Sequence, residues 1–551
     1  MSKILIYDTT LRDGAQGEGI SFFLPAKIRI ARALNEFKID YIEGGFAASN
    51  PKDMEFFQEM KKEKLSHARL VAFGSTRRAR FTAAKDPGLA ALLEAGTPAV
   101  TIFGKSWPLH VEQVLKTTLP INLDMIYDSV QFLKKAGKEV IYDAEHFFDG
   151  YAEDADYTLQ TLQAAADAGA DALVLCDTNG GTLTSTVTAI TKLIVERFPK
   201  MRVGIHTHND ADLAVANSLV AVECGATMVQ GTINGYGERT GNANLCSIIP
   251  ALALKMNHKL SCGVRLHKLR RISQLVDDVA NQNPVKNQPY VGASAFAHKA
   301  GMHVDGVSKL TSSFEHIPPE SVGNERRILI SELSGASNVR LKTDEMGLSF
   351  QKDSPAVKDI LARLENMEKN GYAFESADAS FKLLVQKVLK KHTPYFELLG
   401  FNVAVQKKDV SSKAMTLATI KISVKGQTEL AAGEGAGPVD ALNSALRTVL
   451  RRFYPSIDSV TLQDYNVRIL NPETATRATT RVLIESSDGS NRWGTVGVSE
   501  NIIEASWEAL LDSVEYKLLL DEQKKRRSSA GKKARPVAEK KTRSAAEKEK
   551  K

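Results

Sequence analysis

The chain has 551 residues, of which 43% are hydrophobic and 25% are charged. This composition is ordinary for a soluble globular protein. The length predicts three or four domains. No apolar run reaches the ~18 residues that a membrane helix requires, so we expect no membrane partner.

The cysteines predict a reducing compartment. Cys176, Cys224, Cys246 and Cys262 lie far apart and form no Cys-x-x-Cys pair, which argues against a disulfide scaffold or a zinc knuckle. The first residues, Met-Ser-Lys-Ile-Leu-Ile-Tyr-Asp, reach an acid too early for the apolar core of a signal peptide. We therefore expect a cytoplasmic protein with free thiols.

The formal net charge of +7 comes from the end of the chain. Residues 523–551 contain 13 Lys and Arg against three Glu, so the preceding 522 residues carry a net charge of −3. This tail lacks aromatic residues and is poor in large aliphatic ones, so we expect it to be disordered. A basic tail can attract nucleic acid, but a solvated terminus is the better interpretation, and nucleic acid is not an expected partner.

Residues 3–230 predict eight β-strands that alternate with helices. The strands are expected at 3–7, 41–44, 69–73, 99–103, 139–142, 172–175, 202–206 and 227–230, and amphipathic helices at 25–35, 121–136, 155–168, 183–197 and 212–223. Glycines follow several of these helices, as C-terminal caps do. Eight such units favour a TIM (β/α)8 barrel over an open doubly wound sheet. We assign this catalytic barrel to residues 1–265.

A TIM barrel collects its chemistry at the C-terminal ends of its strands. The predicted strand ends of this chain carry hydrogen-bonding or ionisable residues, where a structural barrel would have neutral turn residues. In chain order they are Arg12 and Asp13, Glu43, Thr101, Asp143 and Glu145, Asp177 and Thr178, His206 and His208, and Asn234 and Asn242. The first two lie in a Gly-rich loop that also contains Gln16 and Glu18. We therefore predict an active site at this end of the barrel.

The rest of the chain predicts two further regions before the tail. Residues 266–392 form a helical linker region, with a capped amphipathic helix at 353–370. Residues 393–522 contain a repeat of 64 residues, because Phe401-Asn-Val recurs as Tyr465-Asn-Val and Asp440-Ala as Glu504-Ala. Each half predicts three strands and a helix, so we expect an α+β domain made of a duplicated βββα unit. Such a domain suggests regulation or dimerisation.

A metal site is predicted from two parts of the barrel. His206 and His208 are two positions apart on a strand, so their side chains point to the same face. Asp13 can complete the set, because the first strand of a closed barrel neighbours the last ones. Two imidazoles and a carboxylate leave open coordination positions, as catalytic metal sites do, and Asn242 is a further candidate oxygen ligand. Zinc, manganese, iron and magnesium all fit this set.

A divalent ion with open positions binds an α-keto acid through its carboxylate and ketone oxygens and polarises the ketone. Arg12, next to the proposed ligand, is placed to neutralise the oxyanion that forms, and Thr178 to bind the substrate carboxylate. Glu145 and His303 are candidates for general acid or base. Both residues could also have a purely structural role. Glu145 could pair with a nearby cation, and His303 could be a hydrogen-bonded histidine of the linker region.

Several motifs together resemble the DRE-TIM metallolyase superfamily. These are Asp8-Thr-Thr-Leu-Arg-Asp-Gly, His206-Thr-His-Asn-Asp and Gly241-Asn. Gly-Met-His-Val-Asp-Gly at 301–306 and Gly433-Glu-Gly-Ala-Gly-Pro-Val-Asp-Ala narrow the resemblance to the 2-isopropylmalate, homocitrate and citramalate synthase branch. The segments 13–22 and 41–53 are most similar to those of long-form (R)-citramalate synthases, and the resemblance covers residues 4 to about 518.

The resemblance implies a Claisen-type condensation of acetyl-CoA with pyruvate, followed by thioester hydrolysis to citramalate and CoA, in isoleucine biosynthesis. It also implies a divalent metal ion (Mn, Mg or Zn), a homodimer, and isoleucine as a feedback inhibitor at the C-terminal domain. The implied metal ligands are Asp13, His206 and His208, with Asn242 close by; the implied catalytic residues are Arg12, Glu145 and His303; and the implied substrate-binding residues are Arg12, Gln16, Glu43, Asp143 and Thr178. Whether Glu145 or His303 is the base stays open.

Two positions depart from the resembled family. A tyrosine in the family pattern Tyr-Glu-x-x-x-Pro-Glu corresponds to Phe314, which has no hydroxyl, so any role of that hydroxyl is not expected here. His316 is a candidate substitute. Another type of citramalate synthase has Tyr-x-Glu beside the keto acid, where this chain has Asp143 and Glu145. Its pyruvate pocket is therefore not a copy of that type.

Other interpretations remain open on sequence alone. The keto acid could be 2-ketoisovalerate, as in 2-isopropylmalate synthase of leucine biosynthesis, or 2-oxoglutarate, because the sequence gives no pocket volume. A lyase is disfavoured, since no cysteine lies in a Gly-Gly-Cys-Pro loop like that of HMG-CoA lyases. A biotin-dependent carboxyltransferase would have a modified lysine where this chain has Asp143 and Glu145. A barrel scaffold with a nucleic-acid-binding tail is the non-enzymatic alternative.

Overall fold

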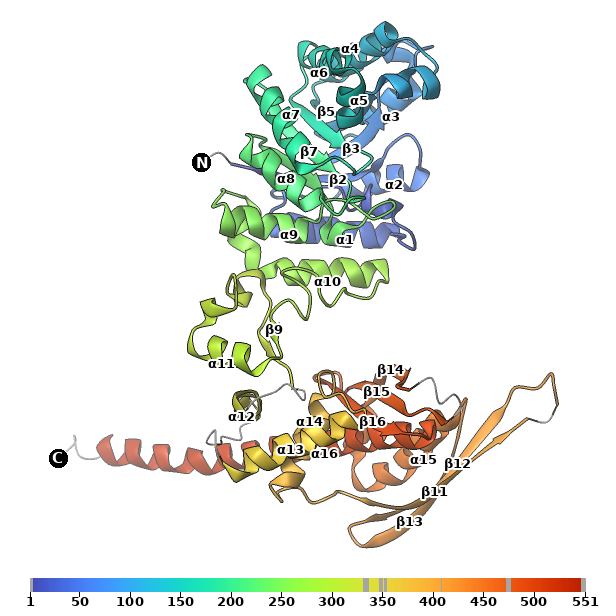
Figure 1. The fold of residues 1–551 in the computed structure, drawn as a ribbon, viewed down its shortest axis with the longest axis vertical. Coiled ribbons are helices and arrows are strands. Elements are labelled where there is room, and N and C mark those ends of the chain that lie inside the picture. The colour runs from blue at the N-terminus through green and yellow to red at the C-terminus, as the bar shows by residue number, and fades with distance from the viewer. Residues whose placement is uncertain are drawn as a thin grey trace. The chain divides into compact units, whose positions relative to one another are not determined.

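The computed structural model describes residues 3–330, 336–345, 350, 354–407, 409–471 and 477–546, without the side chains of 336, 337, 345 and 527–546. The chain divides into two compact units (Figure 1). Unit 1 consists of Met1–Phe296 and Glu315–Arg326, and unit 2 of Ala297–Phe314 and Arg327–Lys551.

Unit 1 is built on a closed barrel of eight parallel strands. They are β1 (Leu5–Asp8), β2 (Tyr41–Phe46), β3 (Arg69–Ser75), β4 (Ala99–Lys105), β5 (Glu139–Glu145), β6 (Ala172–Asp177), β7 (Arg202–Thr207) and β8 (Met228–Gly231). Each strand pairs with the next, and β8 pairs with β1 to close the ring. All residues of β6 are buried, as expected of a strand covered on both faces. The predicted TIM barrel and its eight strands are confirmed.

Helices surround the barrel (Figure 1). They are α1 (Leu24–Phe37), α2 (Pro51–Met60), α3 (Pro87–Glu94), α4 (Leu119–Lys135), α5 (Phe147–Glu153), α6 (Ala155–Asp167), α7 (Thr184–Arg197) and α8 (Ala214–Glu223), followed by α9 (Leu245–Pro250) and α10 (Leu269–Ala280). The five expected helices correspond to α1, α4, α6, α7 and α8. Side chains of Asp86 and Asp154 accept backbone N–H groups at the starts of α3 and α6. Gly137 follows α4 with a φ of +76°, as a C-terminal cap requires.

The barrel interior is a packed core that changes character toward the strand ends. Buried side chains that fill it include Tyr41, Val71, Ile141 and Val174. Side chains two positions apart on a strand share a face. The next interior positions after these four are Glu43, Phe73, Asp143 and Cys176. The apolar interior therefore gives way to polar and aromatic groups at the C-terminal ends of the strands, where the site was predicted.

Unit 2 begins with short strands and helices. They are β9 (Ala297–His298), α11 (Gly301–Lys309), β10 (Arg327–Ile328), α12 (Ala336–Glu345), α13 (Pro355–Lys369) and α14 (Asp378–Val388). The predicted helix at 353–370 is α13, apart from residue 353, which lies outside the described residues. The Ser354 side chain accepts a hydrogen bond from the backbone N–H of Val357, so the predicted cap is also present.

Two βββα halves follow. The first contains β11 (Glu397–Gln406), β12 (Met415–Val424), β13 (Gln427–Gly435) and α15 (Pro438–Phe453), and the second contains β14 (Thr461–Ile469), β15 (Thr480–Ser487), β16 (Arg492–Ser499) and α16 (Ile502–Ala546). Each half has an antiparallel three-stranded sheet. The register of β11 shifts between Leu398 and Gly400, and that of β14 between Leu462 and Asp464. The predicted duplication is confirmed, and even this irregularity recurs 64 residues later.

A glycine sets the distance between sheet and helix in each half. A Cβ atom on Gly433 would lie 2.3 Å from the backbone nitrogen of Ala445, and one on Gly497 would lie 2.0 Å from the backbone oxygen of Ala505. Only glycine allows this approach of strand to helix backbone. The two halves also share a core, because Trp507 of α16 belongs to the same buried cluster as Leu446 of α15.

The tail differs from the prediction. We expected residues 523–551 to be disordered, but α16 continues as a helix to Ala546, and 547–551 lie outside the described residues. Lys, Arg, Ala, Glu and Gln are strong helix formers, and a helix that already begins at Ile502 needs no new nucleus to extend. Within the described parts of the chain, none of the helices combines the length and apolarity needed to cross a bilayer.

Candidate active site

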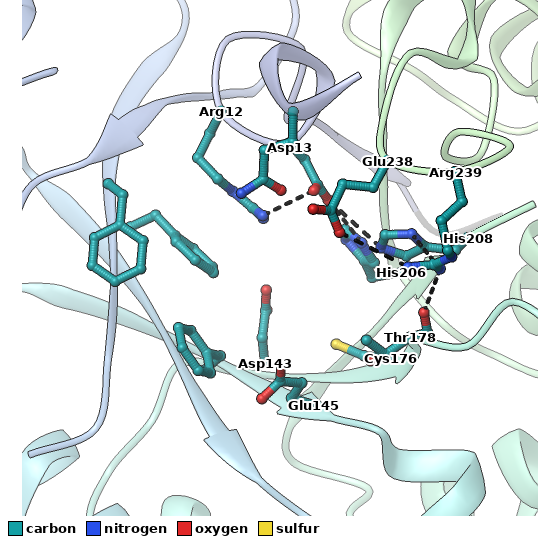
Figure 2. Close-up of a pocket in the computed structure, with 14 residues that line it drawn as sticks. Arg12, Asp13, Asp143, Glu145, Cys176, Thr178, His206, His208, Glu238 and Arg239 are labelled. Carbon is teal, nitrogen blue, oxygen red and sulfur yellow. Dashed lines mark hydrogen bonds and ion pairs between the residues drawn. The ribbon is translucent and has the colours of Figure 1, made fainter. Parts of the chain in front are cut away.

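The turn after β1 presents Arg12 and Asp13 to the barrel mouth. Asp8 accepts hydrogen bonds from the backbone N–H and the hydroxyl of Thr10, both at 3.0 Å. The Thr10 hydroxyl oxygen in turn accepts the backbone N–H of Ile233 at 2.9 Å. These bonds join the turn to the segment after β8 and fix its backbone, so that both side chains point into the pocket shown in Figure 2.

Asp13, His206 and His208 meet in this pocket (Figure 2). The Nε2 atoms of His206 and His208 lie 3.2 and 3.8 Å from Oδ2 of Asp13, and one ligand atom from each residue lies within 4.8 Å of the others. All three side chains are buried. Asn242 donates a hydrogen bond to Asp13 Oδ2 at 2.7 Å. Its Oδ1 is buried and has no hydrogen-bond partner among the described residues.

The electrostatics of this group suit a cation. Burial alone would raise the pKa of Asp13, but the charge of Arg12 and the contacts of His206 and His208 lower the pKa well below its ordinary value, so Asp13 is ionised. Burial and the neighbouring His206 lower the pKa of His208 to about 4, so this imidazole is neutral at neutral pH. Burial alone would lower the pKa of His206, but its contact with Asp13 raises it above the ordinary value, so a cation would have to displace a proton from this imidazole. A carboxylate and neutral imidazoles are the protonation states that metal ligation requires.

Arg12 is held on three sides. Its Nε donates to Oε1 of Glu43 at 2.5 Å, and its Nη1 lies 3.1 Å from Oδ1 of Asp13. Its guanidinium stacks 3.8 Å above the ring of Phe73. Glu43 also accepts the hydroxyl of Tyr7 at 2.6 Å. A buried guanidinium fixed in this way presents its remaining N–H groups to the pocket without further ordering.

Glu145 and Thr178 lie at the ends of β5 and β6. Glu145 forms an ion pair with Lys105 of β4, so it does pair with a nearby cation, and it also lines the pocket. The hydroxyl oxygen of Thr178 accepts the backbone N–H of His146 at 2.8 Å. This contact orients the hydroxyl and leaves its hydrogen available to donate to an anion.

The pocket has a volume of about 270 Å³. Eight of the predicted residues line it, namely Arg12, Asp13, Gln16, Asp143, Glu145, Thr178, His206 and His208. In Figure 2, Asp143 and Glu145 lie on the other side of the pocket from Arg12 and Asp13. Glu43 and Asn242 are not among the lining residues, because they support Arg12 and Asp13 from behind.

Six lining residues were not predicted, namely Phe46, Phe73, Phe103, Cys176, Glu238 and Arg239. The three phenylalanine rings form a wall with centroids 5.4 to 6.3 Å apart. Phe73 and Phe103 lie on the interior faces of β3 and β4, so strand alternation could have found them. Arg239 donates to the backbone oxygen of Thr178 at 2.9 Å and lies 3.2 Å from Nδ1 of His208. Its loop gives no periodic signal from which this position could be predicted.

His303 belongs to unit 2. It lies on α11, and its ring stacks on Phe314 with centroids 4.4 Å apart. Phe314, at the position of the family tyrosine, therefore packs an aromatic ring without a hydroxyl against His303. His316 lies in unit 1, where its ring stacks on Phe296 with centroids 6.1 Å apart.

Three family models match consecutive parts of the chain. Residues 3–276 match the HMGL-like model, residues 290–371 the homocitrate synthase post-HMGL domain-like model, and residues 375–518 the LeuA allosteric (dimerisation) domain. The first covers the barrel of unit 1, and the last covers the two βββα halves of unit 2.

Curated relatives match nearly the whole chain. The (R)-citramalate synthase of Geobacter sulfurreducens is 52% identical over 95% of this chain and 99% of its own, and that of Aquifex aeolicus is 52% identical with the same coverage. A probable 2-isopropylmalate synthase of Methanopyrus kandleri is 30% identical over 93% of this chain and 98% of its own. This chain therefore belongs to the (R)-citramalate synthase family.

Proposed function

We propose that this chain condenses acetyl-CoA with pyruvate and hydrolyses the thioester product, releasing (R)-citramalate and CoA. The observation that carries the proposal is the identity of 45–52% with five (R)-citramalate synthases over 93–95% of the chain. The alternative keto acid, 2-ketoisovalerate, has weaker support, since the 2-isopropylmalate synthases compared are 29–30% identical.

Asp13, His206 and His208 would hold a divalent cation (Mn, Mg or Zn), with Asn242 beside them. The donor set fits, because it joins an ionised carboxylate to two imidazoles, and the unpartnered Oδ1 of Asn242 offers a further oxygen. When bound, the cation would polarise the ketone of the keto acid.

The chain's own residues would bind the keto acid and balance its charge. The Thr178 hydroxyl donates to the carboxylate of pyruvate. Arg12, already fixed by Glu43, directs its remaining N–H groups at the ketone oxygen and stabilises the negative charge that develops there. The phenylalanine wall gives the methyl group of pyruvate an apolar surface and excludes water from it.

A base removes a proton from the methyl group of acetyl-CoA, and the resulting enolate carbon bonds to the ketone carbon of pyruvate. The ketone oxygen then takes up a proton, water attacks the thioester, and CoA leaves as the thiol. Glu145 in the pocket and His303 on α11 are the candidates for the base. Lys105 keeps the carboxylate of Glu145 in place through their ion pair.

Unit 2 would regulate this activity. Its match to the LeuA allosteric (dimerisation) domain supports a homodimer and a feedback amino acid at this domain. Isoleucine is the expected inhibitor, since citramalate would supply isoleucine biosynthesis. We also propose a cytoplasmic location, where acetyl-CoA and pyruvate are both available.

The test is a CoA-release assay with acetyl-CoA and pyruvate, 2-ketoisovalerate or 2-oxoglutarate, with and without EDTA and isoleucine. We expect the highest kcat/KM with pyruvate, loss of activity in EDTA, and inhibition by isoleucine. The variants Asp13→Ala and His208→Ala should lose turnover and keep their circular dichroism spectra. A preference for 2-ketoisovalerate would overturn the substrate assignment, and full activity of either variant would overturn the cation site.

A further inference from the structure

Gln230 lies beneath the pocket, where its side chain joins His206 to Asp143. It belongs to β8 and is completely buried. Its backbone pairs with Tyr7 of β1, and its side chain enters the barrel interior. Strands β8 and β5 are not neighbours in the ring, but the amide of Gln230 reaches Asp143 on β5. A neutral side chain thus bridges the barrel beneath the pocket.

The two ends of this amide make different hydrogen bonds. Nε2 donates to Oδ1 of Asp143 at 3.0 Å. Oε1 lies 2.8 Å from Nδ1 of His206, and as a carbonyl oxygen it can only accept a hydrogen bond from that nitrogen. In this arrangement Nδ1 of His206 carries a proton.

The consequence appears at the other ring nitrogen. In a neutral imidazole with its proton on Nδ1, the lone pair is on Nε2. Nε2 of His206 is the atom 3.2 Å from Oδ2 of Asp13, so the lone pair points at the proposed cation position. Reversing the amide would place its NH2 group against Nδ1 and move the proton to Nε2, where it would block ligation.

Asp143 opposes that reversal, because its carboxylate, when ionised, can only accept and therefore pairs with the amide N–H at the far end. We propose that Gln230 is a positioning residue that selects the metal-binding tautomer of His206, with its own orientation fixed by Asp143. This inference rests on the cation site of the proposed function. Asp143 then has two roles. It lines the pocket, and its Oδ1 accepts the hydrogen bond that orients Gln230 beneath the pocket.

The experiment measures Mn²⁺ binding to the full-length apoprotein by calorimetry, without substrates. Gln230→Met keeps the length of the side chain and removes both polar ends. The matched control is Gln163→Met, because Gln163 on the exposed face of α6 also donates to an aspartate, Asp167, at 2.8 Å. We expect Gln230→Met to weaken Mn²⁺ binding about 10- to 100-fold, the usual effect of losing a partner of a metal-ligating histidine, and Gln163→Met to change nothing.

A second pair of variants separates proton placement from packing. Gln230→Glu keeps an acceptor for His206 but sets two carboxylates against each other, so it should also weaken binding. Adding Asp143→Asn restores a donor opposite the new carboxylate, and the double variant should bind Mn²⁺ more tightly than Gln230→Glu alone. A purely structural role would give no such recovery. The visible absorption of the Co²⁺-loaded proteins reports the same difference in ligation.

Two results would overturn the inference. One is Mn²⁺ affinity of Gln230→Met equal to that of Gln163→Met, and the other is a double variant that recovers nothing. In both cases the unmodified protein still binds Mn²⁺, so the cation site and the proposed function survive. An unmodified protein without Mn²⁺ affinity would contradict the cation site itself, and the role of Gln230 with it.

Discussion

At the scale of single residues, the chemistry depends on side chains that are fixed before any substrate binds. Arg12 illustrates this. Its ion pairs with Glu43 and Asp13 and its stacking on Phe73 use the flat, forked shape of guanidinium. A lysine at this position would carry the same charge on a compact ammonium, which cannot make both ion pairs and also stack.

We therefore predict that Arg12→Lys lowers kcat by about 10²- to 10³-fold, the usual cost of removing an oriented group that stabilises charge in a transition state. The matched control is Arg32→Lys. Arg32 is a largely exposed arginine that also pairs with a glutamate, Glu63, so the same substitution there should leave kcat unchanged. Steady-state kinetics with pyruvate and acetyl-CoA would check both variants. An Arg12→Lys enzyme within tenfold of the unmodified kcat would show that charge alone suffices.

The site residues differ in how far the sequence could predict them. The meeting of Asp13 with His206 and His208 could be predicted, because His206 ends β7, His208 follows it, and β1, which leads to Asp13, lies near β7 in a closed barrel. Glu43 accepts a hydrogen bond from Arg12, and only the three-dimensional packing reveals this contact. Gln230 gave no signal, since its partner Asp143 is on a strand across the barrel.

At the scale of elements, the sequence predicted what hydrophobic periodicity controls. The eight strands were located because buried parallel strands are short apolar runs. Helices α3 and α5 have only 8 and 7 residues, too few for a clear helical period. The tail is predicted to be disordered because it cannot form a core. Its secondary structure is instead decided by its helix propensity and by its position at the end of α16, which begins at Ile502.

The glycines of unit 2 give a test at this scale. We predict that Gly433→Ala and Gly497→Ala each lower the free energy of unfolding by about 1–3 kcal/mol, because the added methyl group meets backbone atoms that cannot move away without separating strand from helix. Gly400→Ala is the control, since a Cβ there has no atom within 4 Å. It should leave stability unchanged or raise it slightly.

Denaturant unfolding of the full chain in a Trp107→Phe background, where the fluorescence comes from Trp493 and Trp507 of unit 2, would measure these effects. The repeat makes the experiment stricter, because the two glycines occupy equivalent positions 64 residues apart. Both substitutions should therefore act in the same direction. A Gly433→Ala or Gly497→Ala variant as stable as Gly400→Ala would contradict the close approach of strand to helix.

At the scale of the whole molecule, each unit has its own core and its own proposed ligand. The barrel of unit 1 contains the cation site, with ligands from the β1 turn and from β7. The halves of unit 2 share a separate buried cluster around Leu446 and Trp507. A ligand stabilises the folded form of the part to which it binds, by an amount set by its concentration relative to Kd.

We predict that Mn²⁺ added to the apoprotein slows amide hydrogen exchange in unit 1 around the cation site, in peptides that cover the β1 turn, β7 and the loop after β8. At 100 times Kd the stabilisation is about 2.7 kcal/mol, which corresponds to about 100-fold slower exchange wherever opening requires release of the ion. Peptides from β11 to β16 should be unaffected by Mn²⁺ and should respond to isoleucine. Mass spectrometry of exchanged peptides measures both responses in one preparation. Protection by Mn²⁺ confined to unit 2 would contradict the assignment of the cation to the barrel, because no ligand of the proposed site belongs to that unit.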